Sequence, residues 1–217
     1  MKISTKSSFV GKIADYLGVN KTFHEYTEID VDPNDDAVIS PVEAKIVHIG
    51  RIDQEGVIVS KGHRKVLLEE LIGDHANQFL NRKYINFYLN PSNKHFWITP
   101  YDGVFTYTQK NEGRSWLPVC IGLENILGIE MLSKAIKRNA SIGSIFKTKD
   151  FSIAMIAVGS LNVNRVHIDY EGMKKYKKGT PCGYFSVGSS MLLCFPDNLR
   201  ILVEEESNVK IGQKILT

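Results

Sequence analysis

Residues 183–190, GYFSVGSS, form the segment on which the interpretation of this chain depends, and they lead directly into the apolar run MLLCF at residues 191–195. Aromatic and branched residues dominate both segments, so we expect strands at residues 182–187 and 191–195. A Gly-Ser bond, Gly188-Ser189, lies between the two expected strands. Such a pair is common, and its meaning depends on the segments that precede it.

The composition indicates an ordinary globular protein. A chain of 217 residues favours one domain and is long enough to bury a sizeable core. Hydrophobic residues make up 43% and charged residues 24%, which is typical of soluble domains. The net charge of +3 is too small to indicate a nucleic-acid partner. We expect the basic tracts at residues 134–138 and 174–178 to be a solvated helix face and a solvated turn.

The cysteines and the N-terminus bear on metal binding and location. Cys120, Cys182 and Cys194 have neither metal-ligand spacing nor a paired framework, so we expect no metal site and a reducing compartment. Residues 1–12 lack the apolar core of a signal peptide, and no apolar run is long enough to span a bilayer. We therefore expect a cytoplasmic protein that meets a membrane, if at all, peripherally.

Hydrophobic periodicity predicts a mainly β protein of the α+β class. Residues 9–17 have the spacing of a short amphipathic helix, which packs on the core or docks on a lipid surface. We divide the chain into an N-terminal helical segment, residues 1–36, and a main domain, residues 37–217. Helices are expected at residues 67–73 and, as the one longer helix, at 123–138. Strands are expected at residues 37–41, 42–50, 56–60, 84–89, 95–99, 104–108, 151–158, 163–169, 182–187, 191–195, 201–203 and 209–216. This pattern predicts a single domain of antiparallel sheets, of barrel or sandwich type, with a few short helices.

Four blocks of sequence resemble those of a known family, in the family's order and over residues 39–217. They are SPVEA at residues 40–44; KGH at 61–63 with LEELIG at 68–73; LNP at 89–91 with His95 and PYDG at 100–103; and KGTPCGYFSVGSS at 178–190. Together they make the chain similar to phosphatidylserine decarboxylases, the pyruvoyl-dependent lyases of phospholipid synthesis.

The resemblance gives the Gly-Ser bond a chemical role. It implies that the Ser189 hydroxyl attacks the Gly188 carbonyl and that the chain is cut between these two residues. The products would be residues 1–188 and residues 189–217, the second beginning with a pyruvoyl group made from Ser189. That group forms a Schiff base with the substrate amine and accepts the electron pair when carbon dioxide leaves. The family also implies a homodimer.

This chain departs from the family's pattern at several positions that bear on self-cleavage. The family's aspartate is Glu43 here, the glycine after it is Ala44, and the threonine after the reactive serine is Ser190. Of two histidines spaced three apart, the first is kept as His95, which the resemblance places as the proton donor to the product carbon. The second, the base for self-cleavage, is Ile98, and an isoleucine cannot accept a proton.

Three other residues are candidates for the missing base. His48, His63 and Asp102 carry groups that can accept a proton, and the sequence alone does not place them in space. His63 also suits a buried structural role. Glu43 keeps the negative charge of the family's aspartate and is a weaker candidate to support processing.

Three functions remain open from the sequence. The first is a self-processed decarboxylase acting on an amino-acid or aminophospholipid-type substrate. The second is an unprocessed, non-catalytic relative that binds a ligand or partner through the same pocket. In the third, residues 41–46 and 209–215 form the two halves of a lipoyl- or biotinyl-type sandwich. The carrier role is discounted because no Met-Lys-Met or Asp-Lys-Ala turn is present.

Overall fold

The structure is a computed structural model of the whole chain. The residues it describes are 2–6, 12–13, 16, 26–59, 65–90, 92–112, 139–159, 166–185 and 189–217. The helix expected at residues 123–138, most of the one expected at 9–17, and the residues His63 and Gly188 therefore lie outside the described residues.

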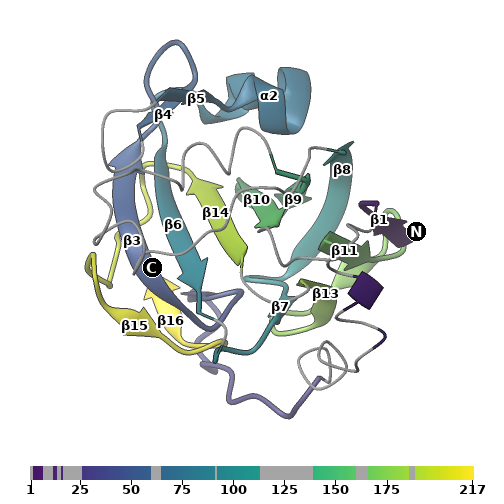
Figure 1. Cartoon of the computed structure of the whole chain (residues 1–217). Helices are drawn as coiled ribbons and strands as arrows, with labels where there is room; N and C mark the ends of the chain where they lie inside the picture. The colour runs from purple at the N-terminus through teal and green to yellow at the C-terminus, as the bar shows by residue number, and fades with distance from the viewer. Residues whose placement is uncertain are drawn as a thin grey trace.

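An antiparallel sheet of eight strands forms the centre of the molecule (Figure 1). Its strand order is β12-β8-β9-β10-β14-β6-β3-β15, so β14 has a neighbour on each side. The strands are β12 (Lys175–Tyr176), β8 (Gly103–Asn111), β9 (Ser141–Lys147), β10 (Ser152–Gly159), β14 (Ser189–Phe195), β6 (Lys83–Leu89), β3 (Ala44–Arg51) and β15 (Asn208–Val209).

A second, four-stranded sheet packs on one face of the large sheet. It has the order β1-β11-β13-β7, with β1 (Lys2–Ser4), β11 (Val166–Asp169), β13 (Pro181–Phe185) and β7 (Phe96–Ile98). Two small pairs complete the strands: β16 (Lys214–Leu216) with β2 (Val38–Ile39), and β4 (Val57–Val59) with β5 (Lys65–Leu67). The helix α2 (Glu69–Ile72) continues as the 3-10 helix η2 (Gly73–Phe79) and lies beside the β4–β5 pair (Figure 1).

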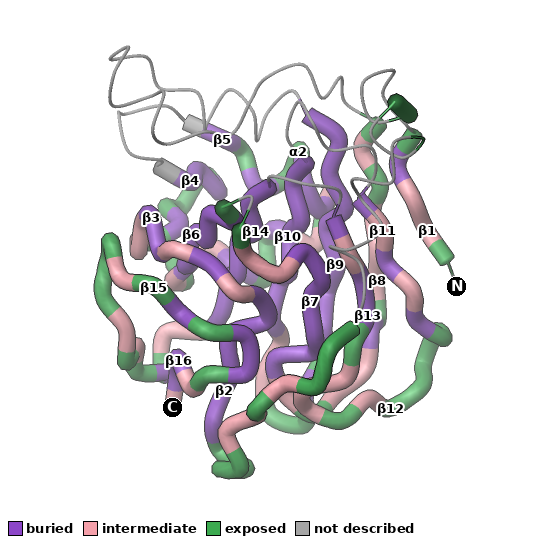
Figure 2. The backbone as a smooth tube through the Cα atoms, turned by 60° about the horizontal axis from the view of Figure 1, so that its bottom comes forward, coloured by how far each residue is buried: buried purple, intermediate pink, exposed green. Residues whose placement is uncertain are grey.

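The residues of β14 are buried on both faces of the sheet (Figure 2). Met191, Leu193 and Phe195 belong to the main core, which also contains Trp97 and Phe185 from the smaller sheet. The alternate residues of β14 belong instead to a second core cluster, which includes residues from α2 and η2. A strand covered on both faces needs apolar residues in succession, which explains the uninterrupted run that follows Ser190.

The predicted fold class is confirmed. The chain is mostly β, antiparallel and a single domain, and its sheets form a sandwich-like arrangement that does not close into a barrel. The two ends of the main domain do meet, because β16 pairs with β2 and β15 pairs with β3. The basic tract at residues 174–178 is largely exposed, as predicted, although Lys175 and Tyr176 also form the edge strand β12.

Several elements differ from the prediction. The strand β9 was not expected because Gly143 interrupts its apolar pattern. A Cβ on Gly143 would lie 2.4 Å from the carbonyl oxygen of Leu71, so the glycine allows α2 to approach the sheet. The strand β1 was not expected either, since the segment of residues 1–36 was taken as helical. Leu67, expected in a helix, belongs to β5, while Ile201 forms only an isolated bridge.

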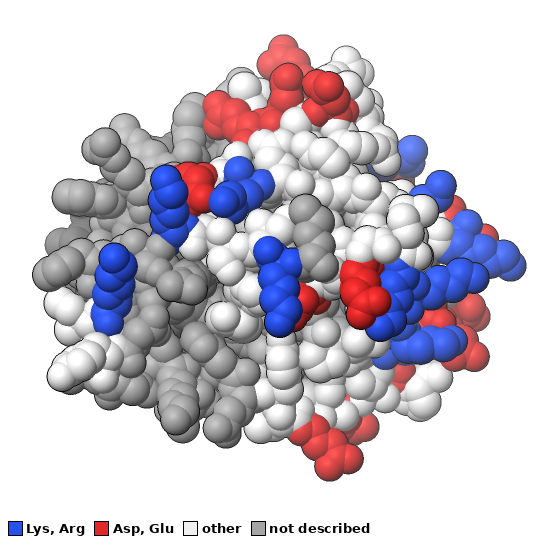
Figure 3. Space-filling view, turned by 90° about the vertical axis from the view of Figure 1, so that its right-hand side faces the viewer, with Lys and Arg blue, Asp and Glu red and all other residues white. Residues whose placement is uncertain are grey.

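The described surface carries mixed charge. Figure 3 shows a face on which Lys and Arg side chains lie near Asp and Glu side chains. Ion pairs of this kind include Lys2 with Asp169, at 3.3 Å, and Lys174 with Glu171, at 3.1 Å. Among the described residues, no helix is long and apolar enough to cross a membrane.

Candidate active site

Ser189 is the first residue of β14 and lies in the interior of the large sheet. It pairs with Leu89 of β6 on one side and with Gly159 of β10 on the other, and it is fully buried. Within the described part of the chain, neither its hydroxyl nor that of Ser190 has a hydrogen-bond partner. A buried hydroxyl without a partner costs about 1–3 kcal/mol, so its presence needs a reason. A reactive role for Ser189 is such a reason.

His95 is fully buried immediately before β7 and is oriented by a backbone carbonyl. Its Nδ1 lies 2.7 Å from the carbonyl oxygen of Asn93. A carbonyl oxygen can only accept a hydrogen bond, so Nδ1 must carry the proton. In the neutral ring, Nε2 is therefore the basic nitrogen, the one that can exchange a proton with a reacting group.

Asn93 connects this histidine to Glu43. Its side-chain amide donates to Glu43 Oε1 at 3.0 Å, and its Oδ1 accepts the backbone N–H of Asn90 at 2.8 Å. The backbone N–H of Asn93 in turn donates to the carbonyl of Asn90 at 2.9 Å. Asn93 is thus held on both sides, and Glu43, Asn93 and His95 form one hydrogen-bonded chain.

The strands bring His95 and Ser189 toward the same place. Trp97 and Met191 line one small space in the core. His95 precedes Trp97 by two residues and Ser189 precedes Met191 by two, so each shares a strand face with its neighbour. The N–H of Phe185 donates to the carbonyl of His95 at 2.7 Å. The chain then needs only four residues, at most about 14 Å, to pass from Phe185 to Ser189.

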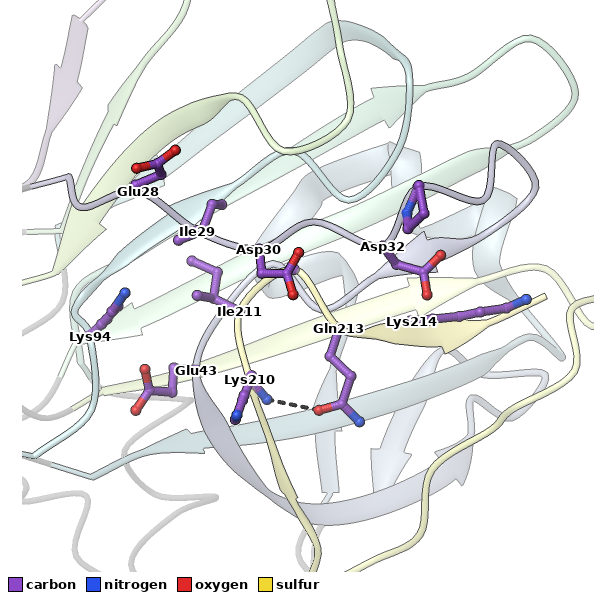
Figure 4. Close-up of a pocket in the computed structure, with 12 residues that line it drawn as sticks. Glu28, Ile29, Asp30, Asp32, Glu43, Lys94, Lys210, Ile211, Gln213 and Lys214 are labelled. Carbon is purple, nitrogen blue, oxygen red and sulfur yellow. Dashed lines mark hydrogen bonds between the residues drawn. The ribbon is translucent and has the colours of Figure 1, made fainter.

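A charged hollow of about 580 Å³ lies against this hydrogen-bonded chain (Figure 4). Lys94 and Glu43 lie at one end of it and Lys214 and Asp32 at the other (Figure 4). Its charged lining residues are Glu28, Asp30, Asp32, Glu43, Lys94, Lys210 and Lys214. As far as the structure describes the chain, the three lysines make no ion pair. Both signs of charge are therefore available to a ligand.

Gly212 lets the chain close around the hollow. Its φ is +87°, and a Cβ there would lie 2.3 Å from the carbonyl oxygen of Asp30. The N–H of Asp32 donates to the carbonyl of Gly212 at 3.0 Å, and the N–H of Gly212 donates to the carbonyl of Ser40 at 3.0 Å. Glycine is the residue that permits both the left-handed backbone and the close approach.

Comparison with known proteins identifies the family. A family model described as phosphatidylserine decarboxylase matches residues 22–217. This chain belongs to the phosphatidylserine decarboxylase family. A phosphatidylserine decarboxylase proenzyme of Anoxybacillus flavithermus is 29% identical over 215 residues, covering 91% of this chain and 78% of that protein.

Two further relatives carry the same name, phosphatidylserine decarboxylase proenzyme. The protein of Geobacillus sp. is 31% identical over 189 residues, which cover 85% of this chain and 70% of the relative. The protein of Coxiella burnetii is 26% identical over 208 residues, which cover 86% of this chain and 72% of the relative. The similarity thus extends over most of both chains.

Ile98 is the position at which the resemblance to phosphatidylserine decarboxylases places a base. It is fully buried and belongs to a third core cluster, with Ile39, Phe96 and Ile211. Trp97, on the opposite face of β7, belongs to the main core. The side chain of residue 98 therefore has apolar neighbours, while Trp97 lies on the other face of β7.

The other candidates for the base lie elsewhere. His48, on β3, has its Nδ1 2.6 Å from Glu205 Oε1. Asp102 accepts hydrogen bonds from Lys177 Nζ at 2.7 Å and from the Lys178 N–H at 2.8 Å. Partial burial raises the pKa of Asp102, but these bonds and the lysine charges outweigh it and leave the pKa below its usual value.

Asp102 and Ser189 lie at opposite ends of the large sheet. Asp102 precedes Gly103, the first residue of β8, whereas Ser189 pairs with Gly159 at the last residue of β10. The register pairs Val158 with Ser141 and Ser141 with Asn111, the last residue of β8. The length of β8, roughly 27 Å at the usual rise per residue, therefore separates the two ends.

Asn93 was missed by the sequence analysis, which treated residues 90–93 only as a turn. Glu43 and Asn93 are 50 positions apart in the chain, so no local sequence pattern predicts their contact. The available signal was Glu43, which the resemblance places at the family's aspartate position and whose side chain is longer by one methylene.

Proposed function

We propose that this member of the phosphatidylserine decarboxylase family cuts itself between Gly188 and Ser189 and then decarboxylates an amino-acid or aminophospholipid-type substrate. The observation that carries the proposal is the Ser189 hydroxyl, which is fully buried and has no hydrogen-bond partner in the described part of the chain. The resemblance places it at the serine of the family's Gly-Ser bond, directly after Gly188.

Self-cleavage uses atoms of the chain and one water. The Ser189 Oγ bonds to the Gly188 carbonyl carbon while the C–N bond breaks, which gives an ester and a free Ser189 amine. A base removes the Ser189 Cα proton, and the ester C–O bond breaks to release the Gly188 carboxylate. The proton taken from Cα returns to Cβ, which makes the methyl group, and water then replaces the nitrogen as ammonia and leaves a ketone. Glycine suits residue 188 because it tolerates a strained backbone.

The residues at the site fit the pyruvoyl group that this reaction would leave. The Ser189 backbone is held between β6 and β10, and the Ser190 hydroxyl is a buried group still in need of a partner. The pyruvoyl carbonyl would supply the sink for the electrons released when carbon dioxide departs. His95 would hold the proton that the product carbon receives, because Nδ1 donates to the Asn93 carbonyl and Nε2 is the basic nitrogen of the neutral ring.

The hollow supports a substrate that carries both signs of charge. An amino-acid headgroup has an ammonium and a carboxylate, which carboxylates such as Glu43 and lysines such as Lys94 and Lys210 can bind. These groups would orient the substrate by charge, not by apolar contact. Lys94, next to His95 in the chain, is one of the lysines that line the hollow.

The intact mass of the purified chain under denaturing conditions tests the proposal. We expect two chains, residues 1–188 and 189–217, with the smaller one beginning in a pyruvoyl group. Their summed mass should equal that of the uncut chain plus one water minus one ammonia. Ser189→Ala, which lacks the hydroxyl, should remain a single chain. One uncut chain for the natural sequence would contradict the proposal.

A second function is favoured if the natural chain stays whole. Glu43, Ala44 and Ile98 depart from the family's processing residues, and the charged hollow does not depend on cleavage. The protein would then be a non-catalytic relative that binds an amino-acid or headgroup ligand in the hollow. Calorimetric titration of the uncut chain with serine and with phosphoserine tests this, and Lys94→Gln should weaken the binding.

We also propose that the protein is a homodimer in the cytoplasm, with at most peripheral membrane contact. Sedimentation equilibrium tests the dimer, and flotation with vesicles of phosphatidylcholine, with and without phosphatidylserine, tests the contact. A monomer at micromolar concentration, or a chain released from membranes only by detergent, would contradict the corresponding part.

A further inference from the structure

We infer that His95 is the base that starts self-cleavage, in place of the histidine that the family resemblance assigns to residue 98, and that Asn93 positions it. The inference rests on the proposed function, because it concerns the proton of Ser189 in the first bond-making step. It gives one imidazole two consecutive tasks, first as base in processing and then as proton donor to the product.

The protonation state of His95 suits a base. The Asn93 carbonyl, 2.7 Å from Nδ1, fixes the proton on that nitrogen. Nε2 then carries the lone pair in the neutral ring. When Nε2 takes a proton, the ring becomes a cation in a fully buried position. The same carbonyl stabilises that cation through a charge-assisted hydrogen bond.

Asn93 holds this carbonyl in place. Its side chain bridges Glu43 Oε1, at 3.0 Å, and the Asn90 N–H, at 2.8 Å. In a triad, a carboxylate orients the histidine directly. Here the carboxylate of Glu43 contacts the asparagine, which in turn presents its carbonyl to His95. Asn93 is therefore a positioning residue, and Glu43 acts on the ring through it.

The direction of the strands points to the same assignment. β7 and β13 are antiparallel, so the end of β7 next to His95 lies beside the end of β13 at Phe185. From Phe185 the chain continues to Ser189. Moving along β14 from Met191 to Ser189 approaches the same connection. By alternation, His95 and Ser189 are expected on the side of Trp97 and Met191, which line one small space in the core.

Other described groups are less suited to the task. Asp102 lies at the far end of the sheet and is held by Lys177 and Lys178. His48 is held by Glu205, at 2.6 Å, and is in edge-to-face contact with Tyr84 on the opposite half of β6 from Leu89. His63 lies outside the described residues, so the experiment must include it.

Every proton that moves in this step can be followed. Nε2 of His95 takes the hydroxyl proton as the Ser189 Oγ bonds to the Gly188 carbonyl carbon. The imidazolium then gives this proton to the Ser189 nitrogen as the C–N bond breaks. The ring is neutral again after the ester has formed, and no oxidant, metal or additional reactant takes part.

The test is the rate at which freshly synthesised full-length chain is cut after cell-free translation is stopped. Losing a positioned base costs about 10²- to 10⁴-fold, so His95→Gln should slow cleavage by this factor. His75→Gln, the same change on the 3-10 helix η2, is the matched control and should be cut at the natural rate. His95→Gly should be rescued by added imidazole, a readout that a structural role would not give.

Asn93→Ala tests the positioning role. The backbone carbonyl remains, but it loses the side-chain contacts that hold it, so we expect cleavage to slow about 10-fold. We also expect the pH midpoint of the cleavage rate to shift downward, because the imidazolium is less well stabilised. An unchanged pH profile would show that Asn93 acts only on folding.

The outcomes separate the inference from the proposed function. A natural chain that is never cut overturns both. A natural chain that is cut, together with His95→Gln that is cut equally fast, overturns the inference and leaves the proposed function standing. If His63→Gln stops cleavage while His95→Gln does not, His63 is the base. Circular dichroism of each uncut variant excludes misfolding as the cause of a lost cut.

Discussion

Ser189, His95 and Ile98 together determine how this chain could process itself. The serine hydroxyl and the imidazole are both completely removed from water, where proton transfer between them meets no competing solvent. Ile98 is just as buried, but its neighbours Ile39, Phe96 and Ile211 form an apolar cluster. At the scale of single residues, a base at His95, as inferred above, implies that self-cleavage does not need a histidine at residue 98.

Restoring a histidine at residue 98 tests this view. Ile98→His places a polar ring in an apolar cluster, which costs about 1–3 kcal/mol if the ring finds no partner. We expect a lower free energy of unfolding and no faster cleavage. Ile98→Val, which only removes a methylene, is the control and should cost about 0.5–1.5 kcal/mol. Faster cleavage by the histidine variant would show that residue 98 reaches Ser189.

At the scale of elements, the pairing of β13 with β7 places His95 beside Phe185, four positions before Ser189. Gly183 makes this pairing possible, because the ring of Trp97 lies over it. A Cβ on Gly183 would be 2.1 Å from Trp97 Cζ2 and 2.4 Å from the carbonyl oxygen of His167. The ring of Trp97 also packs on Phe185, with 4.4 Å between the ring centroids.

We expect Gly183→Ala to disturb this element. Forcing a methyl group into the packed space costs about 1–3 kcal/mol, since Trp97 or β11 must move. His95 should move with Trp97, so the cut should also slow. Tryptophan fluorescence during urea unfolding measures the first effect and gel analysis of cleavage the second. Gly172→Ala is the control, because a Cβ there has nothing within 4 Å. Equal stability of the two variants would contradict the prediction.

The elements that could be predicted from the sequence are those with an intact local pattern. Runs of apolar, aromatic and branched residues predicted β6, β8, β10 and most of β14, and the resemblance pointed to Ser189, His95 and Glu43. The strand β9 could not be predicted, because Gly143 serves the approach of Leu71 from a distant segment. The contact between Asn93 and Glu43 depends in the same way on the pairing of β3 with β6, which no local pattern contains.

The whole molecule depends on several groups that must remain neutral in the core. Burial raises the pKa of the Cys194 thiol to about 12 and raises that of Cys182 well above its usual value. Burial, together with the charges of Cys194 and Glu205, also raises the pKa of Tyr84. These pKa values are higher in the folded state than in the unfolded state. The contribution of these neutral groups to the free energy of unfolding is therefore fully present below the unfolded pKa values. It is lost as the pH rises above them, because the unfolded chain then releases protons that the folded chain keeps.

We therefore expect the free energy of unfolding to fall as the pH rises above about 8.5, where cysteines of the unfolded chain ionise. The loss should approach about 1.4 kcal/mol per pH unit for each such group. Urea titrations of the uncut Ser189→Ala chain between pH 7 and 11 measure it. In Cys194→Ala, the free energy of unfolding should fall less per pH unit, measured relative to that variant's own value at pH 7. A free energy that stays constant over this range would contradict the prediction.

The central place of β14 determines what becomes of the two pieces after the proposed cut. The piece that begins at Ser189 would keep β14 between β6 and β10, β15 beside β3, and β16 beside β2. Separating it would break three strand pairings of the large sheet, and the β16–β2 pair as well. Maturation would thus be a one-way event, in which dilution does not release the short piece and a molecule that loses it cannot recruit a replacement without unfolding. Each copy of the protein would carry the only cofactor it will ever have.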